Sequence, residues 1–288
     1  MSELRDIREL AGDTEAYRSE LFRRWTGLLS YRYIGRHHSL MNNGAVDDTV
    51  TIRRDMRNRV GGLMAAPLAI ASPEGCQTDM VAVPNPVIAS VQIIDPGVDV
   101  QRIEIVGSGV IHQGRTMGFG RCLIVDADNP SRVLAFNEGQ GAIIGIPPDG
   151  LDRMDVDEHA LHIEDSPDLP PLWRAFGANR RDDGHWTLPT LSADLASPDA
   201  ALHIGPQHVV LETAATELAA EVAGTANLQI RSWHVMFMAR GKVGPFRVDG
   251  VAHAGGTSSV GVRMLLVDEG NDGKVVTSAT ALFDVGEG

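Results

Sequence analysis

The alternation of apolar and polar residues predicts that this chain consists mainly of β-strands, in two groups. The first group covers residues 81–94, 101–110, 119–126 and 132–144, and the second covers 225–238, 243–254, 259–268 and 274–285. Short turns rich in Gly, Pro and Asp separate the runs, which is typical of antiparallel strands. Each group follows a segment with helical character, so the sequence predicts an α+β fold.

Three segments are predicted to be helical. Residues 61–72 are apolar on all sides, as in a buried helix, and Pro67 either kinks that helix or marks its true first turn. Residues 205–224 have Pro206 in the first turn, alanines through the body and a glycine at the end. Residues 3–29 form two amphipathic pieces, which we interpret as a packing or interface element.

A twelve-residue motif occurs twice, at residues 109–120 and 250–261. The two copies share six residues in identical spacing, namely Gly109, Val110, His112, Gly114, Thr116 and Gly120 with Gly250, Val251, His253, Gly255, Thr257 and Gly261. An apolar run, an acidic turn and a second strand-like run follow each copy. An internal repeat of this kind indicates a duplicated unit.

The repeat suggests four parts. We predict an N-terminal helical segment at 1–38, a first repeat at 39–145, a connection at 146–191 and a second repeat at 192–288. The connection is rich in Pro and charged residues and has few core-forming runs, although its aromatic residues predict that it packs on the repeats.

Composition narrows the class of protein. The 288 residues are 43% hydrophobic, and a formal net charge of −13 argues against general nucleic-acid binding and against binding to an anionic membrane surface. No run reaches the ~20 apolar residues of a membrane span, and the N-terminus lacks an apolar signal core. Cys76 and Cys122 form no disulfide framework and are predicted to be buried. We therefore expect a soluble, cytoplasmic protein.

Two motifs resemble those of the PaaI-like acyl-CoA thioesterases, which have the hot-dog fold. The segment Gln113-Gly-Arg-Thr116 resembles a Gln-Gly-Lys/Arg-Thr turn of that family. The family also has an Asn-x-x-Gly-x-x-His-Gly-Gly entry to its helix, with an acid nine residues after the histidine. The resemblance implies a double hot-dog, in which one helix is wrapped by a curved antiparallel sheet in each repeat.

The two halves match different parts of the helix-entry motif. The first half has Asn58 and Gly61, but Met64 stands at the histidine position. The second half has His208 and, nine residues on, Glu217, while Val209-Val210 replaces the diglycine. The resemblance therefore implies one composite site between the repeats, which would hydrolyse an acyl-CoA to a free acid and coenzyme A.

Thioester hydrolysis requires a polarised carbonyl and an activated nucleophile. Backbone amides at the helix start, around Gly62, Met64 and Ala65, would supply the first requirement, with help from the Asn58 side chain. Glu217 would act as a general base on water, or as a nucleophile, and desolvation would strengthen it as a base.

Other interpretations of the acidic and histidine residues stay open. Glu217 can also be a solvated helix position. Glu212 is the rival acid, because it lies four residues from His208 and can share its helix face. Five residues on a helix span about 140°, so only one of the two glutamates is expected to face the site. His208 is either catalytic or a hydrogen-bonding residue at the helix entry.

The basic residues suggest a place for the phosphates of coenzyme A. They are Arg53, Arg54, Arg57 and Arg59, together with Arg115 of the repeated motif. A solvated strand face is the alternative. Gln113, Gly114 and Thr116 form the turn that would contact the substrate, while His112 and His253 are predicted to be structural or ligand-lining.

No metal or separate cofactor is expected, because coenzyme A is part of the substrate. The pairs His37-His38 and His159/His162 lack a cysteine or paired acids to complete a metal site. Two such chains are expected to pair as a homodimer, as is usual for the fold.

Two other function classes remain as alternatives. A hot-dog hydratase or dehydratase would carry an Asp-x-Asn-Pro-x-His element, but the segment 83–88 lacks both the aspartate and the histidine. A non-catalytic acyl-CoA-binding module is consistent with the incomplete motif in each half.

Overall fold

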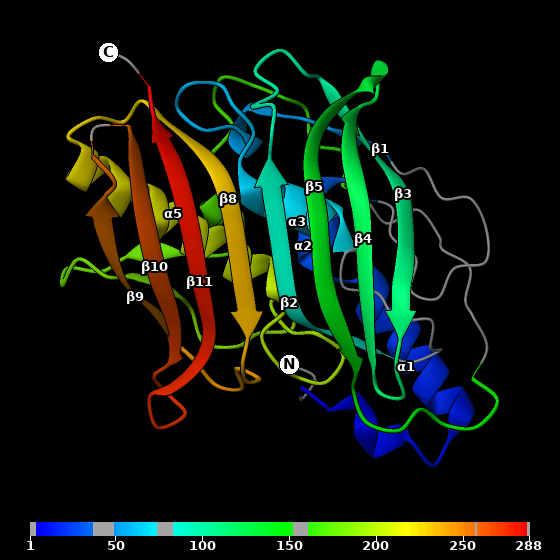
Figure 1. The fold of residues 1–288 in the computed structure, drawn as a ribbon. Helices are drawn as coiled ribbons and strands as arrows, with labels where there is room; N and C mark the ends of the chain where they lie inside the picture. The colour runs from blue at the N-terminus through cyan, green and yellow to red at the C-terminus, as the bar shows by residue number, and fades with distance from the viewer. Residues whose placement is uncertain (1–3, 37–48, 74–82, 152–160, 257, 287–288) are drawn as a thin grey trace.

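The computed structural model describes residues 4–36, 49–73, 83–151, 161–256 and 258–286. One antiparallel sheet extends through the described chain and curves around the helices (Figure 1). Its eleven strands lie in the order β1-β3-β4-β5-β2-β8-β11-β10-β9-β7-β6. Their bounds are β1 Thr49–Thr51, β2 Pro84–Ile93, β3 Arg102–Gln113, β4 Met117–Asp126, β5 Asn129–Ile143, β6 Asn179–Arg180, β7 Trp186–Leu188, β8 Leu228–Phe237, β9 Phe246–Ala254, β10 Ser259–Asp268 and β11 Lys274–Val285.

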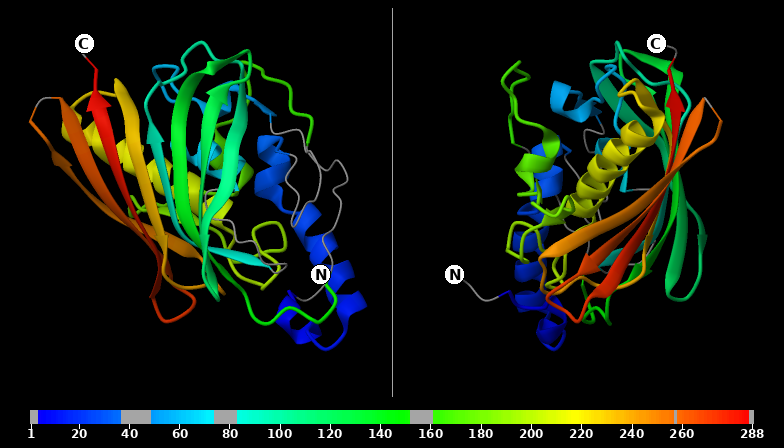
Figure 2. Two further views of the ribbon diagram at one scale, coloured as in Figure 1. Left: turned by 45° about the vertical axis from the view of Figure 1, so that its right-hand side comes forward. Right: turned by 90° about the vertical axis from the view of Figure 1, so that its left-hand side faces the viewer.

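The helices lie mostly on the concave side of this sheet, where α5 crosses the strands (Figure 2). Asp13 caps α1 by accepting a hydrogen bond from the Ala16 amide, and Gly224 ends α5 with a φ of 69°. The helix bounds are η1 Ile7–Leu10, α1 Thr14–Thr26, α2 Leu29–Ile34, η2 Arg54–Met56, α3 Ala65–Ala71, α4 Leu172–Ala175 and α5 Ile204–Ala223.

The two halves of the sheet have the same internal order and meet at β2 and β8. These strands pair antiparallel from Ile88↔Met236 to Gln92↔Ser232. The order β2-β5-β4-β3 in the first half corresponds to β8-β11-β10-β9 in the second, so the repeated motif occupies the same hairpin in each half. The predicted double hot-dog fold is confirmed.

The core lies between the sheet and the helices α3 and α5. All seven residues of α3 are buried, and so is nearly every residue in the first half of α5. The second half of α5 is more exposed, with Glu217, Glu221 and Val222 at the surface. Trp233, Phe246 and Phe283 are among the largest fully buried side chains of the sheet.

The first central helix is shorter than predicted. It begins at Ala65 and not at residue 61, because the preceding residues form a hydrogen-bonded loop. The Asn58 amide donates to the Gly62 carbonyl and the Met64 amide donates to the Met56 carbonyl. Gly61 has a φ of 87°, in the left-handed region that favours glycine. Pro67 therefore lies in the first turn, which was one of the two readings of the sequence.

The other elements agree with the sequence prediction within a few residues. The N-terminal region has three helical pieces, however, and the connection contributes α4 and a small hairpin, whose strand β7 joins the edge of the sheet at β9. Cys122 is buried as predicted, whereas Cys76, His37, His38, His159 and Thr257 lie outside the described residues. The boundaries of the four parts stay a prediction. None of the described helices is both long and apolar enough to span a membrane.

Candidate active site

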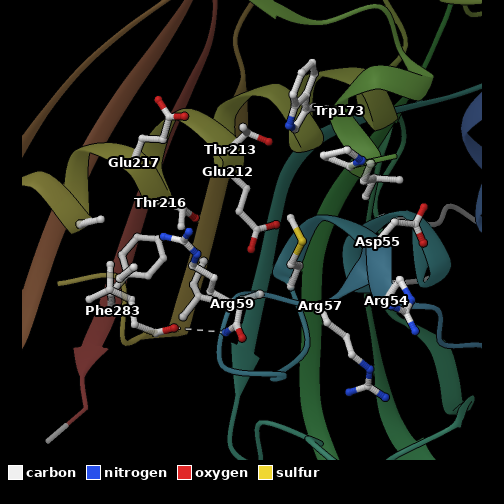
Figure 3. A pocket seen from close by; sticks show the side chains of 18 of the residues that line it. Arg54, Asp55, Arg57, Arg59, Trp173, Glu212, Thr213, Thr216, Glu217 and Phe283 are labelled. Carbon is white, nitrogen blue, oxygen red and sulfur yellow. Dashed lines mark hydrogen bonds between the residues drawn. The ribbon is translucent and has the colours of Figure 1, made fainter. Parts of the chain in front are cut away.

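A cavity of about 460 Å³ lies between the two repeats and the connection (Figure 3). One wall is the face of α5 from Glu212 to Ala220, and the others are the loop before α3, the first turn of α4 with the residues before it, and strands β8 and β11. The lining residues are Arg54, Asp55, Arg57, Asn58, Arg59, Met64, Leu169, Pro171, Leu172, Trp173, Glu212, Thr213, Thr216, Glu217, Ala220, Ala226, Leu228, Ile230 and Phe283.

Glu212 is the buried acid of this cavity. Its side chain points from α5 into the cavity, and the residue is 1% exposed. Oε1 accepts a hydrogen bond from the Ala65 amide at 2.8 Å, and Oε2 accepts one from the Ala66 amide at 2.5 Å. The first amides of a helix have no intrahelical acceptor, and they lie at the positive end of its dipole. Glu212 of the second repeat therefore caps the central helix of the first.

Burial raises the pKa of Glu212 to about 7, although the hydrogen bonds from the Ala66 and Ala65 amides lower it in part. A carboxyl group with a pKa near neutrality can accept a proton and release it again at physiological pH. This is the property that a general acid–base residue needs.

The raised pKa also predicts a pH-dependent stability. The pKa of Glu212 is about 7 in the folded chain and near the ordinary 4.5 in the unfolded chain, so folding favours its protonated form. The contribution of this protonation to the free energy of unfolding is complete below pH 4.5. It is lost as the pH rises through 7, and the free energy of unfolding falls by on the order of 3 kcal/mol. Urea unfolding at pH 5 and pH 8 should show this loss in the wild type and not in Glu212→Gln. Equal pH dependence of the two proteins would contradict the assignment.

Asn58 and Gln229 attach the loop before α3 to the second repeat. The Asn58 Oδ1 accepts hydrogen bonds from the Gly62 and Val60 amides, and its Nδ2 donates to Gln229 Oε1 at 2.7 Å. Gln229 Nε2 donates in turn to the Leu63 carbonyl at 3.4 Å. Asn58 therefore organises the loop and does not present a free side chain to the cavity. The sequence gives no signal for Gln229, which lies in an ordinary strand pattern.

Most of the amides around Gly62–Ala65, which were predicted to polarise the substrate carbonyl, already donate hydrogen bonds within the protein. The Gly62 amide donates to Asn58, and the Leu63 and Met64 amides donate to the carbonyls of Pro96 and Met56. The amides that face Glu212 are those of Ala65 and Ala66. The donors that could polarise a substrate carbonyl are therefore these two amides at the start of α3, and not those of Gly62 and Met64.

Glu217 lines the same cavity but is not desolvated, which corrects the expectation from sequence. Its side chain is 45% exposed, and Oε2 accepts a hydrogen bond from Trp186 Nε1 at 2.8 Å. The Arg180 guanidinium lies 3.6 Å from the same oxygen. Glu212 and Glu217 thus point in different directions from α5, as their spacing predicts, and the buried one is Glu212 (Figure 3).

His208 has a structural position. It is completely buried, its Nδ1 accepts a hydrogen bond from Trp233 Nε1 at 3.0 Å, and it is not among the residues that line the cavity. Burial lowers its pKa to about 3, so it is neutral in the folded chain. The helix-entry residue is His203, whose Nδ1 accepts a hydrogen bond from the Gly205 amide.

The arginines of the basic cluster have different roles. Arg53 is 3% exposed and forms an ion pair with Asp55, so it cannot receive a phosphate as the sequence suggested. Arg57 donates to four backbone carbonyls and holds the loop together. Arg54 is exposed and pairs with Asp165. Arg59 is exposed, and its side chain extends toward Thr216 and Phe283 in the cavity (Figure 3).

The turn of the first repeated motif is separate from this site. Gln113 Nε2 donates to the Gly114 and Met117 carbonyls, and the Gly114 amide donates to the Met117 carbonyl. Arg115 and Thr116 are exposed, and no residue of 113–116 lines the cavity. The structure therefore does not bring these predicted substrate contacts together with Glu212. His112 and His253 are exposed in the matching hairpins.

Comparison with known proteins places the chain by its fold. No protein-family profile and no curated protein matches the sequence. Among solved structures, a tesB protein of Mycobacterium avium subspecies paratuberculosis has a TM-score of 0.54 and 14% identity, and the match covers 86% of this chain and 97% of that one. The acyl-CoA thioesterase II TesB2 of Mycobacterium marinum has a TM-score of 0.54 and 13% identity, with the same coverage. The likeness is one of fold. At these identities it assigns no residue of the site.

Proposed function

We propose that the protein hydrolyses acyl-CoA thioesters, with Glu212 as the general base. The observation that carries the proposal is the buried Glu212 carboxyl on the first amides of α3, at 2.8 and 2.5 Å from Ala65 and Ala66. A base and a pair of oxyanion donors thus meet in one apolar cavity, and each comes from a different repeat. Such donors can stabilise the negative charge that develops on a thioester carbonyl.

The reaction begins when the substrate carbonyl oxygen replaces one oxygen of the Glu212 carboxylate as the hydrogen-bond acceptor of an α3 amide. The freed carboxylate oxygen removes a proton from water as the water oxygen attacks the carbonyl carbon. The amides stabilise the tetrahedral oxyanion. Its collapse breaks the carbon–sulfur bond, and the protonated Glu212 returns the proton to the leaving thiolate. The products are a carboxylic acid and a thiol, and Glu212 is ionised again.

Coenzyme A is the thiol carrier that the surroundings favour. Arg59 is exposed at the cavity in a protein with a net charge of −13, so it provides local positive charge for an anionic carrier. Arg54 is also exposed there, but Asp165 is already paired with it. The named activity of the Mycobacterium marinum neighbour supports the same carrier. The PaaI-like grouping, the homodimer and the cytoplasmic location remain predictions.

The test is release of free thiol from a panel of acyl-CoAs with short, long, aromatic and polycyclic acyl groups. Stoichiometric formation of the free acid would support hydrolysis. Conversion of an enoyl-CoA without thiol release would instead identify a hydratase. Tight binding of the panel without any turnover would identify an acyl-CoA-binding module, and either result would overturn the proposal.

The pH profile of the reaction follows from the same residue. A general base acts in its ionised form, so kcat/KM should rise with pH and level off above the pKa of Glu212, which is about 7. Initial rates between pH 5 and pH 9 test this expectation. A profile that is flat from pH 5 to pH 8 would contradict the role of Glu212 as a base.

A further inference from the structure

We propose that residues 169–173, which end in the first turn of α4, form the wall that selects the acyl group, and that Glu217 holds this wall in place. The inference rests on the proposed function, because it concerns the substrate of the same cavity. It assigns a role to the connection, which belongs to neither repeat, and to the glutamate that is not buried.

The wall lies opposite the open face of α5. Leu169, Pro171, Leu172 and Trp173 all line the cavity. Leu172 is 2% exposed, so its side chain is packed inward. The opposite face consists of Glu212, Thr213, Thr216 and Ala220, whose side chains are mostly small. A change of size in the wall therefore changes the width of the cavity directly.

Glu217 connects this wall to α5 through two tryptophans. Its Oε2 accepts the hydrogen bond from Trp186 Nε1, and the Trp186 ring is 7% exposed. The Trp186 ring packs edge-on against Trp173, with centroids 5.0 Å apart and an interplanar angle of 70°. Since Trp173 is part of the wall, the Glu217–Trp186 bond fixes the wall relative to the helix that carries Glu212.

A second attachment fixes the other side of Trp186. Strand β7 pairs with β9 through Thr187↔Arg247 and Leu188↔Phe246. The connection is thus held by the sheet edge and by Glu217. Loss of the Glu217 bond should let the wall move without unfolding the chain, since the pairing with β9 remains.

The distribution of charge indicates which part of the substrate meets the wall. The arginines of the cavity all lie in residues 54–59, and Arg59 extends toward Phe283 of β11, whereas the wall contributes the apolar side chains of Leu169, Pro171 and Leu172. The anionic thiol carrier fits the side of the arginines, and the acyl group fits the side of the wall. The cavity has a volume of about 460 Å³, in the lower part of the range of about 300–1,000 Å³ that is usual for small-molecule sites. This volume fits a medium-sized acyl group better than a long one.

Binding of acyl-CoA thioether analogues, which cannot be hydrolysed, tests the wall without relying on turnover. Leu172→Ala should improve the Kd of a fourteen-carbon analogue relative to an eight-carbon one by about tenfold, because it lengthens or widens the apolar space. The wild type should prefer the eight-carbon analogue. An unchanged preference in a folded Leu172→Ala protein would overturn the proposal.

Three variants test the attachment. Trp186→Phe removes the donor and keeps a ring, Glu217→Leu removes the acceptor, and Glu217→Gln keeps an acceptor oxygen. The first two should reduce the preference for the eight-carbon analogue several-fold, with little further effect when combined. Glu217→Gln should keep both the preference and kcat. Full additivity in the double variant, or a collapse of kcat in Glu217→Gln, would overturn the role of Glu217 as a positioning residue.

The analogues also separate this proposal from the proposed function. Absence of thiol release together with a chain-length preference that Leu172→Ala shifts would defeat hydrolysis and leave the wall supported. Thiol release without any such shift would defeat the wall and leave hydrolysis supported.

Discussion

Glu212→Gln is expected to lower kcat for thiol release by about 10²–10⁴-fold, which is the usual contribution of a general base. Glutamine keeps the size of the side chain but cannot take a proton from water. Its Nε2 is a donor, so glutamine cannot reproduce the arrangement in which Oε1 and Oε2 each accept one amide, from Ala65 and Ala66. The loss should appear in kcat at every acyl length, measured by thiol release at pH 8.

Glu221→Gln is the matched control for this substitution. Glu221 lies on the same helix, is exposed and does not line the cavity. It should retain the rate of the wild type. Retention of activity by a folded Glu212→Gln protein would show that the buried carboxyl is only a helix cap.

Ala65→Pro is expected to lower kcat by about 10²–10³-fold, because it removes one of the two amide donors that face Glu212. Ala65 is the first residue of α3, where proline is well tolerated. The preceding residue, Met64, has φ −80° and ψ 150°, which is the conformation that a following proline favours. The backbone should therefore be preserved while the donor is lost, and the proline ring also displaces the Glu212 oxygen that the Ala65 amide holds at 2.8 Å, so the variant breaks the whole contact between this amide and Glu212. Thiol release, together with the thermal midpoint of unfolding, measures both effects.

Ala65→Gly keeps the amide and removes only the methyl group, so it separates the donor from the side chain. Its kcat should stay within a few-fold of the wild type. Equal losses in Ala65→Gly and Ala65→Pro would show that packing at this buried position matters and that the amide does not.

The strands could be predicted from sequence because alternation and turns are local properties. The repeat at 109–120 and 250–261 also predicted the symmetry of the sheet, since the same motif occupies the β3–β4 and β9–β10 hairpins. The start of α3 could not be predicted in the same way. Residues 61–64 are as apolar as the helix, but Asn58 and Arg57 hold them in a loop through contacts with segments far away in the sequence.

The choice of acid shows where sequence reasoning ends. Helical spacing correctly indicates that Glu212 and Glu217 face different directions, but it carries no information about which direction is buried. Glu217 accepts a hydrogen bond from Trp186 and pairs with Arg180, both in the connection. Glu212 accepts a hydrogen bond from the Ala65 amide at the start of α3. Both partners come from distant segments. The idea that each half contributes to one site agrees with this geometry. The buried acid is Glu212, however, and not Glu217, which the sequence favoured.

The roles of the arginines depended on tertiary contacts in the same manner. A cluster of four in seven residues suggested one phosphate site, yet burial beside Asp55 accounts for Arg53 and backbone carbonyls account for Arg57. The sequence shows which residues are charged, but not which acids pair with them or which carbonyls accept their hydrogen bonds.

The most direct test of the proposed site is the rate of thiol release from an eight-carbon acyl-CoA by Glu212→Gln and Glu217→Gln in parallel. The structure predicts that the first variant loses at least a hundredfold in kcat and that the second retains nearly the wild-type rate. Loss of activity in Glu217→Gln with retention in Glu212→Gln would contradict the proposed mechanism, because it would place the chemistry on the exposed carboxylate.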